Sequence, residues 1–146
     1  MKINILKKRA NLQERMSKQV EEAGGAATVE VVGKLLSVLD NFDRAFTSVA
    51  AETDADKEVE EAYKGAYAGI LETFKKLGVN EVETVGKEFD YELHNAIMMR
   101  PDPDVEEGFI VEELQKGYVY GEVGTDEEGN RMDGQLIRPA MVVVSA

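Results

Sequence analysis

The first 31 residues carry an apolar stripe that is too narrow to stabilise an isolated helix. Its members are separated by four, four, three, four and four residues, which predicts a helix and lies nearer to an eleven-residue repeat than to a heptad. A second copy of the chain is the most economical partner, and we expect the two helices to run nearly straight. The stripe comprises Leu12, Met16, Val20, Ala23, Ala27 and Val31, with Ile5 and Leu6 ahead of it.

Two adjacent glycines conflict with a continuous helix in this region. Each of Gly24 and Gly25 costs a helix interior roughly 1 kcal/mol relative to alanine. We expect a weak point or a break near residues 24–28, so that residues 1–28 form a stalk. The stalk should melt before the rest of the protein, because local stability follows contact density.

Residues 29–77 contain no proline and predict two further helical segments with wider apolar faces. Thr53 with Asp56 resembles the capping box of a helix start, and Gly78 suits a helix end. Two such helices do not close a core alone, so two copies are expected to form a dimeric four-helix bundle. The predicted dimer interface contains Leu12, Met16, Val20, Leu35, Leu39, Phe42, Phe46, Tyr67, Ile70, Leu71 and Phe74.

After Gly78 the pattern changes to β-branched runs, glycines and all three prolines of the chain. This change predicts an α+β protein, with a helical dimerisation region at 1–78 and a compact all-β domain at 79–146. Pro139 should lie at an edge or a bulge, since proline cannot donate to a sheet ladder. We expect strands at 79–85, 109–114, 118–123 and 136–144, a turn or short helix at 90–96, and a hairpin tip at 124–134.

Composition narrows the class of partner. The formal net charge is −12, from 17 basic and 29 acidic residues, which argues against nucleic acid and against an anionic membrane. A protein partner is the better expectation. The chain has no cysteine, so thiolate catalysis and thiolate metal sites are excluded. No apolar run approaches the length of a bilayer, and we expect a cytoplasmic protein.

Signals for enzymatic chemistry are weak. His94, the only histidine, has Asp90 four residues earlier, which could be a base with its orienting carboxylate. A structural histidine is the commoner explanation. The acidic residues at 126–130 do not have the ligand spacing of a calcium loop, and no phosphate-binding glycine loop occurs. We therefore expect no enzyme activity, no cofactor and no metal.

Four blocks of sequence, in order, resemble those of the GrpE family. The helical block is Leu35-Leu36-Ser37-Val38-Leu39-Asp40-Asn41-Phe42-Asp43-Arg44-Ala45, and the central block is Phe89-Asp90-Tyr91-Glu92-Leu93-His94-Asn95-Ala96-Ile97. The C-terminal blocks are Gln115-Lys116-Gly117-Tyr118 and Ile137-Arg138-Pro139-Ala140-Met141-Val142-Val143-Val144. Any one block would be weak evidence, but the four blocks together are specific to this family. The position that the family usually fills with proline in the helical block is Ser37.

The resemblance implies a co-chaperone: a nucleotide exchange factor for a DnaK-type heat-shock chaperone. It implies a homodimer with a long paired helix, a four-helix bundle and two β domains, one of which presses into the chaperone's ATPase domain and promotes ADP release. Carried over residue by residue, the chaperone contacts would be Arg44, Phe89, Tyr91, Pro139, Met141 and Val144.

Two alternatives remain open at this stage. Met141 and Val144 are equally well explained by packing in the core of the β domain. The whole chain could also be a structural coiled-coil adaptor whose β head binds some other protein.

Overall fold

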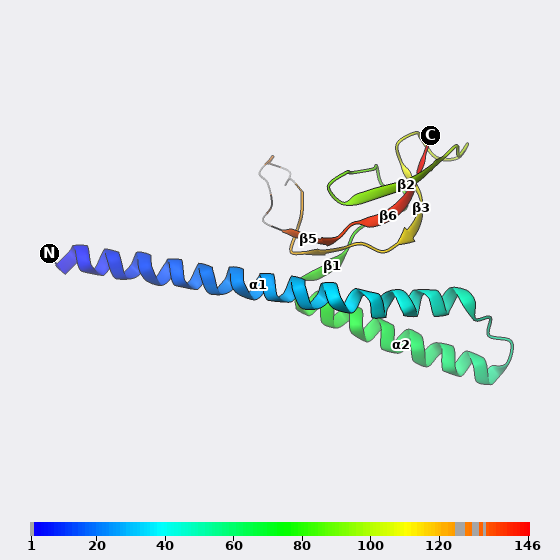
Figure 1. Cartoon of the computed structure of the whole chain (residues 1–146), viewed down its shortest axis with the longest axis horizontal. Helices are drawn as coiled ribbons and strands as arrows, with labels where there is room; N and C mark the ends of the chain where they lie inside the picture. Colours follow the sequence, from blue (N-terminus) through cyan, green and yellow to red (C-terminus); the bar gives the residue numbers. More distant parts are fainter. Residues whose placement is uncertain (1, 125–127, 130–131, 133) are drawn as a thin grey trace.

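The computed structural model describes residues 2–124, 128, 129, 132 and 134–146. Two antiparallel helices lie side by side, and a small β head sits against one side of the pair (Figure 1). The first helix, α1 (Lys2–Ser48), extends far beyond the second, α2 (Asp54–Lys76). At about 1.5 Å per residue, α1 is roughly 70 Å long. The α+β class expected from the sequence is confirmed.

The helix α1 runs without interruption through Gly24 and Gly25, so the predicted break at 24–28 is wrong. Gly25 is buried, because the ring of Tyr120 from the head packs against it. The Thr28 hydroxyl donates to the carbonyl of Gly24 at 3.0 Å, which adds a local bond in the same turn. Tertiary contact therefore outweighs the unfavourable helix propensity of glycine at this point.

Both ends of α2 match their sequence signals. The hydroxyl of Thr53 accepts from the Asp56 backbone N–H at 3.2 Å, and the Asp56 carboxylate accepts from the Thr53 N–H at 2.9 Å. This reciprocal pair is a complete capping box, as predicted. At the other end, Gly78 adopts φ 81°, a left-handed conformation that favours glycine.

Within its described residues, the head contains two three-stranded sheets. The first has the order β1-β4-β5, all antiparallel, and the second has the order β2-β6-β3. In the second sheet, β6 pairs in parallel with β2 and antiparallel with β3. The strands are β1 (Val79–Glu81), β2 (His94–Arg100), β3 (Ile110–Gln115), β4 (Tyr118–Tyr120), β5 (Gln135–Arg138) and β6 (Ala140–Ser145).

Two expectations for the head need correction. Residues 90–96 do not form only a turn or short helix, because the turn ends at Leu93 and strand β2 begins at His94. The predicted strand at 136–144 is divided at Pro139 into β5 and β6, which belong to different sheets. Pro139 thus lies between strands, where no ladder hydrogen bond is required. Most of the predicted hairpin tip lies outside the described residues.

Among the residues that the structure describes, two hydrophobic clusters form the core. The first joins the helices to the head and contains Val32, Leu36, Leu39, Phe74, Val79 and Tyr118. The second lies within the head and contains Val82, Ile110, Val119, Ala140, Val142 and Val144. The head is thus packed on the helix pair through a shared core. Within the described residues, neither helix is apolar enough over a sufficient length to cross a bilayer.

Candidate protein-binding site

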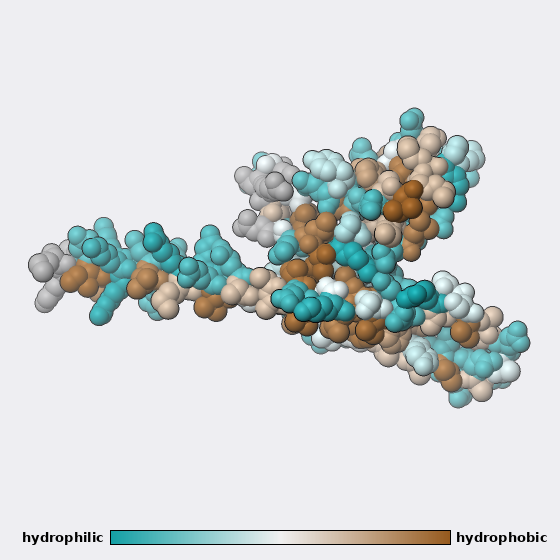
Figure 2. Space-filling view, viewed as in Figure 1, coloured by the Kyte–Doolittle hydropathy of each residue, from teal (hydrophilic) through white to brown (hydrophobic). Residues whose placement is uncertain are grey.

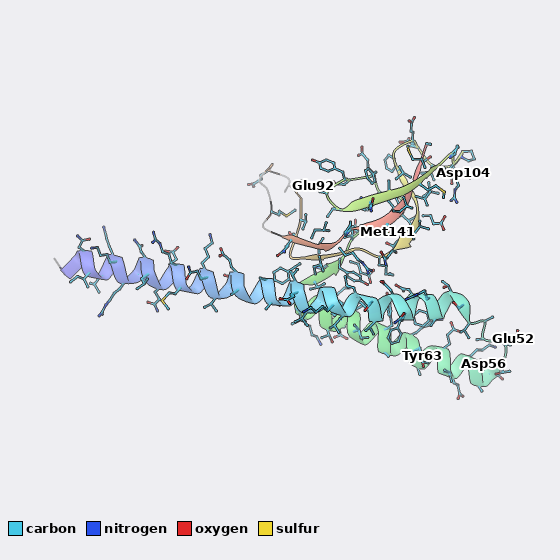
Figure 3. All side chains as sticks on the ribbon, in the orientation of Figure 1. Glu52, Asp56, Tyr63, Glu92, Asp104 and Met141 are labelled. Carbon is cyan, nitrogen blue, oxygen red and sulfur yellow. The ribbon has the colours of Figure 1, made fainter. Side chains whose placement is uncertain are left out.

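The most exposed aromatic side chain of the head lies in the turn before β2. Tyr91 is 83% exposed, whereas Phe89 is half-buried and packs on the second core cluster. The two residues were predicted together as partner contacts, but only Tyr91 presents its whole ring to solvent. Figure 3 shows the neighbouring Glu92 on the part of the head that lies away from the helices.

Backbone hydrogen bonds hold this turn in shape. The Asp90 carboxylate accepts from the Glu92 N–H at 2.8 Å, and the Asp90 carbonyl accepts from the His94 N–H at 2.8 Å. The His94 ring lies beneath the turn and is only 6% exposed. Its Nδ1 accepts from the Asp90 backbone N–H at 3.0 Å, and its Nε2 lies 2.7 Å from the Glu83 carbonyl. Nε2 therefore carries the ring proton and donates a hydrogen bond to that carbonyl.

This geometry does not support the hypothesis that His94 is a catalytic base oriented by the Asp90 carboxylate. The imidazole bonds the backbone N–H of Asp90 and not its carboxylate, and both ring nitrogens already have backbone partners. His94 instead fixes the turn that displays Tyr91. Within the described part of the chain, no group of three or more acidic or histidine side chains is arranged to hold a metal ion.

The three candidate residues of the last block differ in exposure. Met141 is 36% exposed, and Figure 3 shows it on the part of the head nearer the helices. Pro139 is half-buried between β5 and β6. Val144 is only 4% exposed and belongs to the second core cluster, opposite Met99 of β2 and Ile110 of β3. Its burial favours the packing explanation for Val144.

Arg44 lies on α1, exposed, beside a groove between that helix and the head. Its Nη2 donates to the side-chain amide oxygen Oδ1 of Asn41 at 2.5 Å, one helical turn away. The groove is lined by Asp40, Asp43, Arg44, Thr47, Leu114 and Gln115. Leu114, at 51% exposed, was not singled out from the sequence, because a single leucine at a strand end gives no binding signal.

The residues predicted for the dimer interface are exposed, half-buried or buried in the single chain. Leu12, Met16 and Val20 are 59%, 57% and 72% exposed, and Figure 2 shows hydrophobic residues in a row along this part of α1. Leu39 and Phe74 are already buried within one chain, at 1% and 4% exposed. Leu35 is 45% exposed, and the half-buried members are Phe42, Phe46, Tyr67, Ile70 and Leu71.

An ion pair that the sequence does not reveal joins the head to α1. Arg138 Nη1 and Nη2 donate to the two carboxylate oxygens of Asp40 at 2.7 and 2.8 Å. Arg138 Nε and Nη2 also donate to the Lys116 carbonyl, and Gln115 Nε2 donates to Asp40 at 3.1 Å. Asp40 lies in the helical block and Arg138 in the last C-terminal block of the four that resemble the GrpE family. Their pairing could not be predicted, since 98 positions separate them.

A second polar group lies beneath the same junction. Burial raises the pKa of the half-buried Asp43 carboxyl above its ordinary value. Burial also raises the pKa of the Tyr67 and Tyr118 hydroxyls far above the physiological range, so both remain protonated. Among the described residues, neither hydroxyl makes a hydrogen bond of ordinary geometry. The Asp43 carboxyl interacts electrostatically with both hydroxyls, so the three groups form one polar cluster beneath the junction.

Comparison with known proteins places the chain in a family. A sequence model of the GrpE family matches residues 3–146. Protein GrpE of Parageobacillus thermoglucosidasius is 38% identical over 135 residues, which cover 92% of this chain and 54% of that protein. Protein GrpE of Thermosynechococcus vestitus is 32% identical over 136 residues, which cover 93% of this chain and 49% of that protein. This chain thus spans about half the length of these relatives, and it belongs to the GrpE family.

Proposed function

We propose that this protein is a co-chaperone in the cytoplasm, a nucleotide exchange factor for a DnaK-type heat-shock chaperone. The observation that carries the proposal is membership of the GrpE family over nearly the whole chain. The protein would act as a homodimer that binds the ATPase domain, opens its nucleotide cleft and promotes ADP release. It would do so without covalent chemistry of its own.

The mechanism is a coupling between two binding equilibria. The exchange factor would bind the open ATPase domain more tightly, whereas nucleotide favours the closed one. By linkage, each ligand weakens the binding of the other by the same factor. The factor therefore needs a surface that fits the open state better than the closed state.

Exposed surface supports the proposed homodimer. The chain exposes 10859 Å², whereas a compact monomer of 16.1 kDa would expose about 7,400 Å². Much of the apolar part lies on α1 and on α2, where Val59 and Tyr63 are 56% and 53% exposed. We propose that residues 1–28 pair as a stalk and that residues 29–77 form half of a four-helix bundle. Residues 79–146 would be the working head.

The proposed chaperone surface comprises Tyr91, Phe89 and Met141 on the head and Arg44 on α1. Tyr91 would supply an exposed aromatic ring of the kind enriched at binding hot spots. The hydrogen-bonded turn beneath it would reduce the entropy lost on binding. Arg44 would add a cation beside the groove. We assign Pro139 a smaller role and treat Val144 as support for the surface from within the core.

Release of a fluorescent ADP analogue from a cognate DnaK ATPase domain tests the proposal. The parent protein should accelerate release, and the triple variant Arg44→Ala, Phe89→Ala, Tyr91→Ala should bind more weakly while remaining dimeric. Arg100→Ala, which changes another exposed arginine, is the control and should behave as the parent does. No acceleration by a folded, dimeric parent would overturn the proposal. Recovery of a different partner and no chaperone in a pull-down would favour the adaptor alternative.

A further inference from the structure

The carboxylate of Asp40 lies where two short connections, out of the three between the sheets of the head, meet α1. The first connection, Lys116-Gly117, leads from β3 to β4, and the second, at Pro139, leads from β5 to β6. Arg138 precedes the second connection and donates to the carbonyl of Lys116 in the first. The two connections pass so closely that a Cβ at Gly117 would lie 2.4 Å from the backbone nitrogen of Ala140. One helical side chain therefore bonds the point at which two of the three connections pass from one sheet to the other.

This ion pair differs from the others in the described residues. Both of its side chains are only 20% exposed, and it links α1 to the head. The remaining pairs join residues within α1, within α2 or within the head, for example Lys34 with Glu30 at 75% and 70% exposure. A bidentate arginine fork that is screened from water fixes an orientation, whereas exposed pairs of neighbours contribute little.

The apolar contacts at the same junction do not fix an angle in this way. Val32, Leu36, Val79 and Tyr118 hold the head against the helices through contacts that are not directional. The guanidinium carbon of Arg138 also lies 5.9 Å from the ring centre of Tyr118 in this cluster. Asp40 therefore adds the directional contact to an interface that is otherwise held by packing.

We propose that Asp40 and Arg138 are positioning residues that set the angle of the head on the helix pair. They hold the Tyr91 turn on the head and Arg44 on α1 in one relative arrangement. This inference rests on the proposed function, because a fixed arrangement of these two surfaces matters for fitting one ATPase conformation better than another. Without the pair, the head would remain attached and folded but would sample a wider range of angles.

Spin-label distance measurements test the angle directly. The chain has no cysteine, so Lys57→Cys on α2 and Val85→Cys on the head introduce unique, exposed labelling sites. Labelled chains are diluted with unlabelled chains so that only distances within one chain are measured. Asp40→Asn should broaden the distance distribution at a temperature where circular dichroism shows unchanged helix content. Glu30→Gln, which breaks an exposed pair on the same helix, should leave the distribution narrow.

A second variant separates charge from geometry. Arg138→Lys keeps the positive charge but loses the fork that reaches both Asp40 oxygens and the Lys116 carbonyl. It should broaden the distribution as Asp40→Asn does, and it replaces that variant if Asp40→Asn does not fold. Each variant should lower the maximal rate of ADP release at saturating factor roughly tenfold, since small misplacements of a positioned group have large effects on rate.

Two results would overturn the inference. One is a distance distribution in both variants that is as narrow as that of the parent. The other is a broadened distribution with an unchanged maximal release rate. A parent protein that does not accelerate ADP release would instead refute the proposed exchange function, while the distance measurement would still report whether Asp40 and Arg138 hold the head. The two failures are therefore distinguishable.

Discussion

The ring of Tyr120 packs against Gly25, where a Cβ would lie 2.9 Å from Tyr120 Cε1. On the other edge of the ring, a Cβ at Gly78 would lie 3.5 Å from Cε2. The ring thus lies between Gly25 of α1 and Gly78 at the end of α2, and a methyl group at Gly25 would require it to shift. Gly25 is needed here for close approach and not for an unusual backbone conformation, since it lies within a regular helix.

Alanine substitutions at the two adjacent glycines should have opposite effects. Gly24→Ala meets nothing within 4 Å and should stabilise the protein by up to about 1 kcal/mol through helix propensity. Gly25→Ala gains the same propensity but overpacks against Tyr120, which costs about 1–3 kcal/mol. Urea denaturation should therefore rank Gly24→Ala above the parent and Gly25→Ala below it. Equal stabilisation by both substitutions would show that the Tyr120 contact is unimportant.

The capping box at the start of α2 gives a prediction about local stability. Thr53→Ala removes the acceptor of the Asp56 N–H and should cost about 1 kcal/mol. Thr28→Ala is the control, because the Thr28 hydroxyl bonds a carbonyl inside α1, and it should change stability much less. Thermal unfolding followed by circular dichroism measures both. A Thr53→Ala protein as stable as the parent would contradict the capping role.

The buried imidazole of His94 should be required for the stability of the Tyr91 turn. His94→Phe keeps a ring but leaves the Asp90 N–H and the Glu83 carbonyl without their partner, and each such loss costs about 1–3 kcal/mol. Amide hydrogen exchange should show faster exchange at Asp90 than in the parent. The exposed neighbouring substitution Asn95→Ala should not change it. Unchanged protection at Asp90 in His94→Phe would refute the assignment.

Asp43 gives a prediction about pH. Burial raises the pKa of its carboxyl above 3.8, so the folded protein keeps this proton to a higher pH than the unfolded chain does. The resulting stability is present below the unfolded pKa and is lost as the pH rises through the folded one. Asp43→Asn should therefore be more stable than the parent at about pH 7, and the difference should disappear in acid.

Asp56 provides the opposite sign as a control. Its pKa is lowered by its hydrogen bonds with Thr53, so its contribution is present at neutral pH and is lost in acid. Asp56→Asn should consequently be less stable than the parent at neutral pH and converge with it in acid. Denaturant titrations of both variants across this range measure the two trends. An Asp43→Asn variant that is destabilised at neutral pH would contradict the burial argument.

Features that depend on neighbouring residues were predictable from the sequence. The start of α2 at Thr53 and its end at Gly78 follow from local hydrogen bonding and backbone conformation, and both are confirmed. The break at Gly24-Gly25 was predicted from helix propensity alone and is wrong. The missing information was the position of Tyr120, which lies 95 residues further along the chain than Gly25.

Neither strand β2 nor the Asp40–Arg138 pair could be predicted from the sequence, and the reasons are related. Every residue of β2 after His94 is exposed, so the strand has no alternation of buried and exposed side chains to reveal it. The ion pair requires the path of the chain through both sheets, and spacing alone carries no such information. Tyr91 is exposed, as a partner contact must be, and its role stays a prediction, whereas Val144 lies in the core.

The sheet order has a consequence for folding during synthesis. Strand β6 is the last strand in chain order, yet it lies between β2 and β3 and provides the pairing partner of both. Neither β2 nor β3 can find its ladder until β6 has left the ribosome, whereas α1 and α2 can form as soon as they emerge. During that interval, Ile97, Met98 and Met99 belong to a strand without a partner. The nascent head is thus most prone to aggregation just before its final strand arrives.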